Sequence, residues 1–193
     1  MNKSVYSTPN SSTDINRHIL TILVDNEPGV LARVIGMFSG RGYNIDSLNV
    51  AEVSNKQHLS RITIVTHGTN EVIEQIQSQL NRIVPVHTVL NLEKEESSVE
   101  AEVALVYMYL NQENKKKAFQ ICDVYRARKI ENEHNSVIFE IAGTSERIDT
   151  FINDISKITD IEIVRSGPVA ISSKNQEKEE WWEFIMIEML TLT

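Results

Sequence analysis

A four-residue motif that occurs twice constrains the fold of this chain more than any other feature of its sequence. Gly68-Thr69-Asn70-Glu71 and Gly143-Thr144-Ser145-Glu146 each follow a β-branched apolar run and precede a helical apolar pattern. Each copy supplies a glycine where a strand can end, followed by Asn70 or Ser145, which can cap a helix. The 193 residues are therefore expected to contain the same supersecondary unit twice.

The first unit is predicted to have the order βαββαβ. β-Branched residues are frequent in four segments that indicate strands: 18–25, 43–53, 59–67 and 86–94. Two helices are indicated by apolar residues at helical spacing: Val30, Leu31, Val34, Ile35 and Phe38, and then Val72, Ile73, Ile76, Leu80 and Ile83. Pro28 suits a first helical turn, Gly36 is interpreted as a close-packing position, and Gly42 can take the positive φ that follows a helix.

The second unit repeats this order. Its strands are predicted at 102–110, 129–134, 136–143 and 161–167, and its helices at 115–128 and around Ile148, Phe151, Ile152, Ile155 and Ile158. The expected fold class is α+β, with two tandem ferredoxin-like domains of about 75 residues, each a four-stranded antiparallel sheet with both helices on one face. The other face and the sheet edges need cover, so association between chains is expected.

Composition shifts predict the domain boundaries. We expect a polar, disordered arm at 1–17, the first domain at 18–94, an acidic linker at 95–101, the second domain at 102–173 and an acidic, aromatic tail at 174–193. The tail has many apolar side chains, including Trp181 and Trp182. The simpler interpretation is that the tail folds back over its own domain or has no role. The alternative is that it docks onto a partner subunit.

Several functional classes are disfavoured by composition. A net charge of −8 argues against a nucleic-acid groove. Cys122 is the only cysteine and lies among helix-spaced apolar residues, which is typical of an inert core thiol. The five histidines lack metal-site spacing and no nucleophile motif is present, so neither a metal site nor catalytic residues are expected. No apolar run approaches a membrane span or a secretory signal, and a cytoplasmic location is expected.

The sequence DNEPG at 25–29 is the candidate binding feature. The later glycines in GMFSGRG do not match a phosphate-binding motif, and they lie at the C-terminal end of a predicted helix, which repels phosphate. The strand-to-helix turn at the other end offers free N–H groups for a carboxylate. Gly29 leaves room for a ligand, and Asn26 and Asn44 offer both donors and acceptors, with Asn44 expected near this turn.

A purely structural interpretation stays open at this point. Asn26 would then cap the helix and Asn44 would form a turn, since asparagine is favoured at both kinds of position. The corresponding loop of the second unit, NQENKKKAF, has no proline or glycine. We therefore expect the first domain to bind a ligand and the second domain to serve assembly.

The segment ILTILVDNEPGVLARVIGMFSGRGYNIDSLNVA closely resembles the start of the small, regulatory subunits of acetohydroxyacid (acetolactate) synthase, a family of ACT-domain proteins. LSRITIV, AGTSERIDTFI and IVRSGPVAIS are similar to later parts of the same family, so the resemblance spans roughly residues 17–172. The long N-terminal arm and the 174–193 tail depart from it.

The resemblance implies a non-catalytic chain that binds and activates the catalytic large subunit. It also implies feedback inhibition by valine in branched-chain amino-acid biosynthesis, with thiamin diphosphate, Mg and FAD carried by the catalytic partner. The family's effector positions correspond to Asn26, Gly29 and Asn44, with Ile45 and Ala51 as apolar lining, in a pocket where two ACT domains meet in a homodimer. Two alternatives are an ACT-type sensor for another enzyme or a transcriptional system, and a small ferredoxin-like enzyme.

Overall fold

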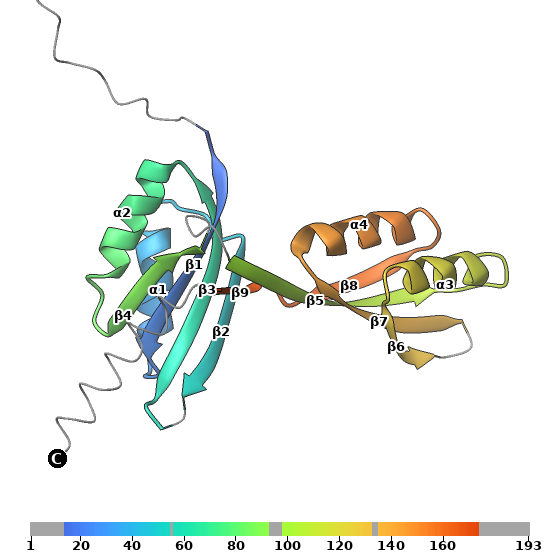
Figure 1. Ribbon diagram of the computed structural model, residues 1–193, viewed down its shortest axis with the longest axis horizontal. Coiled ribbons are helices and arrows are strands. Elements are labelled where there is room, and N and C mark those ends of the chain that lie inside the picture. The colour runs from blue at the N-terminus through green and yellow to red at the C-terminus, as the bar shows by residue number, and fades with distance from the viewer. Residues whose placement is uncertain (1–13, 55, 93–97, 133–134, 174–193) are drawn as a thin grey trace, which may run out of the picture. The chain divides into compact units, whose positions relative to one another are not determined.

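A computed structural model describes residues 14–54, 56–92, 98–132 and 135–173 (Figure 1). The chain forms two compact units, which are described separately. The predicted tail at 174–193 and most of the predicted arm lie outside the described residues. Among the described residues, no helix is both long and apolar enough to cross a membrane.

The first unit has the predicted βαββαβ order. Its elements are β1 (Asn16–Asp25), α1 (Val30–Ser39), β2 (Ser47–Ser54), β3 (Leu59–Gly68), α2 (Asn70–Leu80) and β4 (Val86–Asn91). The sheet order is β2-β3-β1-β4, and β1 pairs antiparallel with both of its neighbours. Strand β1 begins two positions before the predicted start at His18, so the end of the predicted arm belongs to the sheet.

The second unit repeats the order and adds a strand. Its elements are β5 (Ser98–Tyr109), α3 (Lys115–Val124), β6 (Arg128–Asn132), β7 (Ser136–Gly143), α4 (Ser145–Ser156), β8 (Ile161–Arg165) and β9 (Val169–Ser172). The sheet order is β6-β7-β5-β8, with α3 and α4 on the same side (Figure 1). Strand β9 was not predicted. It pairs with residues 98–101, which makes that part of the predicted linker a strand.

The two helix caps were predicted one residue too late. Thr69 and Thr144 are the N-caps of α2 and α4, and their hydroxyls accept the backbone N–H groups of Val72 at 3.4 Å and Arg147 at 3.3 Å. Asn70 and Ser145 are instead the first residues of the helices. Threonine, asparagine and serine all make good caps, so the order of the motif alone could not distinguish them.

Equivalent residues of the two repeats form the cores. Ile73, Ile76 and Leu80 of α2 are fully buried, as are their predicted counterparts in α4, Ile148, Phe151 and Ile155. The second core also contains Cys122, as predicted, and its burial raises the pKa of the thiol to about 12. A thiol with this pKa stays protonated at neutral pH, which excludes a thiolate nucleophile at this position.

A charged network ties three elements of the second unit together. Glu102 of β5 is 3% exposed and accepts hydrogen bonds from Nε and Nη2 of Arg165 at 2.6 and 2.8 Å. The Ser145 hydroxyl donates to the same carboxylate at 3.0 Å, and Nη1 of Arg165 reaches Asp149 at 2.5 Å. The Arg165 hydrogen bonds hold the pKa of Glu102 below its ordinary value of 4.5, against the opposing effect of burial.

We expect Glu102→Gln to lower the free energy of unfolding by about 2 kcal/mol, because the variant breaks a buried ion pair whose arginine is partly exposed. The lowered pKa means that the carboxylate stabilises the folded chain above pH 4.5 and loses that contribution as the pH falls through its folded-state pKa. The difference between wild type and variant should therefore shrink below pH 4.5. Chemical denaturation at a series of pH values measures it.

Glu140→Gln is the matched control. Glu140 forms a cross-strand pair with Arg128 at 2.6 Å, but the Arg128 side chain is 68% exposed. Exposed pairs contribute between about 0 and 1 kcal/mol. Equal losses for the two variants would show that burial of Glu102 adds nothing to its ion pair.

Candidate functional site

The turn between β1 and α1 was predicted to bind a carboxylate. Its backbone is anchored to the neighbouring loops, since the N–H of Asp25 donates to the Pro85 carbonyl at 3.2 Å and that of Asn26 to the His58 carbonyl at 2.5 Å. Gly29 ends the turn with φ +90°, a left-handed conformation that strains any residue with a Cβ. Space around Gly29 is open, since a Cβ there would meet no atom within 4 Å.

Helix α1 starts without a side-chain cap. Its N-cap is Gly29, so the interpretation of Asn26 as the capping residue is wrong. The carbonyl of Gly29 accepts the N–H of Arg33 at 3.0 Å, whereas the N–H groups of Leu31 and Ala32 make no hydrogen bond to the described residues. Both residues are exposed. The turn therefore presents free donors beside an exposed Asn26, an arrangement suited to an anionic group such as a carboxylate.

Side chains brace the same turn. Oδ1 of Asp25 lies 2.6 Å from Nε2 of His87 on β4, and the Arg33 guanidinium contacts the Glu27 carboxylate at 3.3 Å. Arg33 also donates to the carbonyl of Val84. These contacts join the turn to the segment that enters β4, so its donors are held in place before any ligand arrives.

The segment after α1 carries the other predicted polar residue. Gly42 has φ +72°, as predicted for a residue just beyond a helix, and Tyr43 N–H returns to the Phe38 carbonyl at 3.0 Å. The carbonyl of Asn44 accepts the Thr66 hydroxyl at 2.6 Å, and its side-chain Nδ2 donates to Asp46 Oδ1 at 2.6 Å. Asn44 therefore does form part of a local turn, and its side chain remains exposed.

The structure separates the two asparagines within one domain. The backbone of Asn26 is bonded beside the start of β3, while Asn44 is bonded near its end, at Thr66, which pairs with His18. Seven strand residues at about 3.3 Å each put the two ends roughly 23 Å apart. The expectation that Asn44 lies near the first strand–helix turn of its own domain is wrong, because α1 carries the chain back to the end where β1 begins.

The two predicted apolar residues also occupy different places. Ile45 is half-buried beside Asn44, at the same end of the sheet. Ala51 is exposed in β2, which is an edge strand of the first sheet. Neither residue forms a wall around the turn at Gly29 within one chain.

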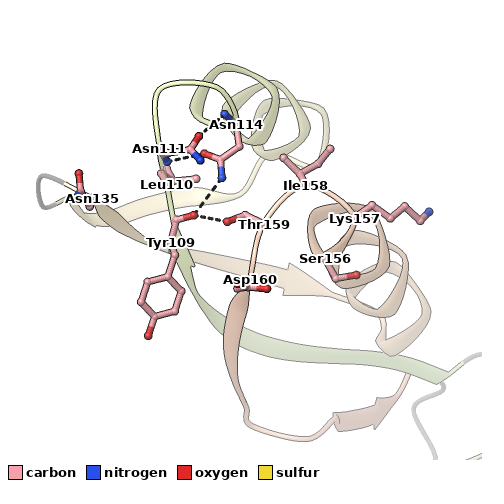
Figure 2. A pocket seen from close by; sticks show the side chains of 10 residues that line it. All are labelled: Tyr109, Leu110, Asn111, Asn114, Asn135, Ser156, Lys157, Ile158, Thr159 and Asp160. Carbon is pink, nitrogen blue, oxygen red and sulfur yellow. Dashed lines mark hydrogen bonds between the residues drawn. The ribbon is translucent and has the colours of Figure 1, made fainter.

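Sequence reasoning missed an open cavity of about 570 Å³ at the corresponding turn of the second unit (Figure 2). It is lined by the end of β5, the turn before α3, the residue before β7, the end of α4 and the loop before β8: Tyr109, Leu110, Asn111, Asn114, Asn135, Ser156, Lys157, Ile158, Thr159 and Asp160. Oδ1 of Asn111 accepts the N–H groups of Glu113 and Asn114 at 2.9 Å each, and Nδ2 of Asn114 and the Thr159 hydroxyl both donate to the Tyr109 carbonyl. Much of this hydrogen-bonding capacity is used internally, unlike that of the first turn.

Comparison with known proteins decides the family. Residues 20–88 match the model of the AHAS small subunit-like ACT domain, and residues 101–174 match that of the small subunit of acetolactate synthase. The probable acetolactate synthase small subunit of Archaeoglobus fulgidus is 36% identical over 161 residues, which is 83% of this chain and 99% of that protein. This chain belongs to the acetolactate synthase small-subunit family.

Other members agree with this assignment. The acetolactate synthase isozyme 3 small subunit of Escherichia coli is 40% identical, over 81% of this chain and 95% of that protein. The crystal structure of the acetolactate synthase small subunit from Thermotoga maritima superposes with a TM-score of 0.74 at 35% identity, covering 83% of this chain and 99% of the other. The ferredoxin-like fold predicted from the repeat, and the ACT type implied by the resemblance, are thereby confirmed.

Two glycines of α1, Gly29 at its N-cap and Gly36 in its interior, give a sharp stability test. We expect Gly29→Ala to destabilise the chain by about 1–2 kcal/mol, because an L-residue is strained at φ +90°. Gly36→Ala should instead stabilise it by about 0.5–1 kcal/mol, since Gly36 lies within the helix and a Cβ would meet nothing within 4 Å. Chemical denaturation followed by circular dichroism measures both.

The same geometry corrects the interpretation of Gly36 as a close-packing position, since the space beside it is open. A destabilising Gly36→Ala, or a neutral Gly29→Ala, would contradict this account of the helix and its turn.

Proposed function

We propose that this chain is the non-catalytic regulatory subunit of an acetolactate synthase. In this proposal it binds the catalytic large subunit, raises its activity and makes it sensitive to feedback inhibition by valine. The proposal is supported by the small-subunit relatives that align over most of this chain. The effector site is proposed on one observation: the turn at Gly29 is exposed and has no side-chain cap, and the N–H groups of Leu31 and Ala32 near Asn26 have no partner among the described residues.

A homodimer would reunite the two halves of the predicted site. Strand β2 lies at an edge of the first sheet, and two copies related by a two-fold axis would place their β2 strands antiparallel. The Asn44 end of one chain would then lie beside the Asn26 end of its partner. About two strand spacings, roughly 10 Å, separate β2 from β1.

Valine suits such a site in charge and size. Its carboxylate would accept the N–H groups of Leu31 and Ala32 of one chain, and its ammonium would reach Asn44 of the other. Ile45 and Ala51 would contribute apolar surface for the isopropyl group. Sensing near 0.1 mM requires about −5.5 kcal/mol of binding free energy, or roughly −0.7 kcal/mol for each of the eight heavy atoms of valine, which is within the range of small ligands.

Inhibition requires that valine bind one arrangement of the complex more tightly than another, because a ligand with equal affinity for both shifts nothing. In this proposal the large subunit performs catalysis in the cytoplasm and holds the thiamin diphosphate, Mg and FAD expected for its reaction.

Affinity capture of this chain from its native cell tests the partnership. The proposal is supported if the captured fraction has acetolactate synthase activity and if this activity rises when more of this chain is added. Capture of a different valine-sensitive enzyme would overturn it.

Asn26→Ala should keep the activation of the catalytic subunit and relieve inhibition by valine. Loss of one side-chain amide beside the carboxylate is expected to weaken valine binding ~5- to 150-fold. Enzyme assays across a valine titration measure the half-inhibitory concentration. Asn81→Ala, at the exposed end of α2, is the control and should leave it unchanged. Unaltered inhibition in Asn26→Ala would remove Asn26 from the site.

A mixed dimer tests whether each site is shared between two chains. Asn26→Ala and Asn44→Ala homodimers should each bind valine weakly. In a heterodimer of the two variants, one site would combine the intact Asn26 of one chain with the intact Asn44 of the other, so about half of the wild-type binding capacity should return. Calorimetry on tandem-tagged heterodimers measures this stoichiometry. Absence of recovery would overturn the sharing of each site between Asn26 of one chain and Asn44 of the other.

A further inference from the structure

A chain of hydrogen bonds fixes the side chain of Asn44. Its Nδ2 lies 2.6 Å from Oδ1 of Asp46, and Oδ2 of the same carboxylate lies 2.6 Å from Nδ1 of His67. We propose that Asp46 is a positioning residue that turns the Asn44 carbonyl oxygen toward the effector, so that this end of the site recognises an ammonium group. This inference rests on the proposed function and deepens it.

The chemistry of the carboxylate settles the orientation of the carboxamide. An ionised carboxylate can only accept hydrogen bonds, so the atom of Asn44 that faces Asp46 must be the NH₂ group. The carbonyl oxygen of the same planar group then points away from Asp46. An asparagine without such a partner could present either its donor or its acceptor to a ligand.

Asp46 is itself held in place from two sides. The backbone N–H of Asp46 donates to the Val65 carbonyl at 2.9 Å, which fixes the main chain against β3. His67, also on β3, occupies the second carboxylate oxygen. With both oxygens engaged, Asp46 has a fixed direction from which to orient Asn44, and the side chain of Asp46 is 34% exposed. Such support is what keeps a binding group in its productive orientation.

The two ends of the domain are therefore opposite in hydrogen-bonding character. The turn at Gly29 offers N–H donors, and the Asn44 end offers an acceptor. A ligand that spans both ends in a dimer must carry a carboxylate at one side and a donor such as ammonium at the other. The site is thus suited to α-amino acids and not to acids of the same shape that lack the amine, because these would leave the Asn44 acceptor unpaired in the bound complex.

The test compares two ligands that differ only in the amine. Valine and 3-methylbutanoate are titrated by calorimetry into the full-length chain, first as wild type and then as Asp46→Asn. A neutral carboxamide at position 46 can donate as well as accept, so it no longer fixes Asn44. Valine affinity should fall roughly tenfold, the lower end of the effect of one hydrogen bond to a charged group. The affinity for 3-methylbutanoate should not change, so the preference for valine falls by the same factor.

Asp25→Asn is the matched control. Asp25 also pairs with a histidine, His87, at 2.6 Å, but it lies at the carboxylate-binding end. Any loss there should affect both ligands equally and leave the preference for valine unchanged. Thermal unfolding of each variant checks its fold, and Asp46→Ser, which also removes the carboxylate, replaces Asp46→Asn if that variant does not fold.

The outcomes separate the inference from the proposed function. In one outcome, wild type binds valine and Asp46→Asn keeps the wild-type preference for valine over 3-methylbutanoate, because it weakens the binding of both ligands equally or of neither. Asp46 then has a structural role only, and the inference falls while the proposed function stands. If wild type binds no valine, the effector part of the proposed function falls and the inference falls with it.

Discussion

The direction of the chain through the first domain governs everything proposed for this protein. Strand β1 ends at Asp25, α1 returns the chain to the opposite end of the sheet, and β2 starts there at Ser47. Donors at the start of α1 and the Asn44 acceptor are thus held at opposite ends of one rigid unit. No small amino acid spans roughly 23 Å, so a ligand that uses both ends requires two copies in antiparallel relation.

The two repeats share a plan but use their polar groups differently. In the second unit, buried Glu102 and the partly exposed Arg165 join β5 to β8. The turn before α3 satisfies many of its own hydrogen bonds through Asn111 and Asn114. In the first unit the equivalent turn has no side-chain cap, and the N–H groups of Leu31 and Ala32 have no partner among the described residues. A site that must take up and release an effector needs such unsatisfied groups, whereas a structural turn is more stable without them.

Each end of the first domain also has an Asp–His pair. Asp25 and His87 brace the turn that offers donors, and Asp46 and His67 lie behind the acceptor. The pairs themselves contact no ligand in the proposed arrangement. In that arrangement their contribution would be to limit the motion of Asn26 and Asn44, so that less conformational entropy would be lost when a ligand binds.

The sequence by itself determined the repeated βαββαβ plan, the core positions such as Ile76 and Phe151, and the positive φ at Gly42, because burial periodicity and glycine geometry are local properties. Sequence reasoning misplaced the caps by one residue. It also took residues 98–101 for a linker and missed β9, since these two short segments become strands only by pairing with each other. Only the tertiary structure decided that Asn26 and Asn44 lie apart and that Asp46 contacts both Asn44 and His67. These facts depend on contacts of both segments with His58, Thr66 and His67, which are distant in the sequence and which no local pattern encodes.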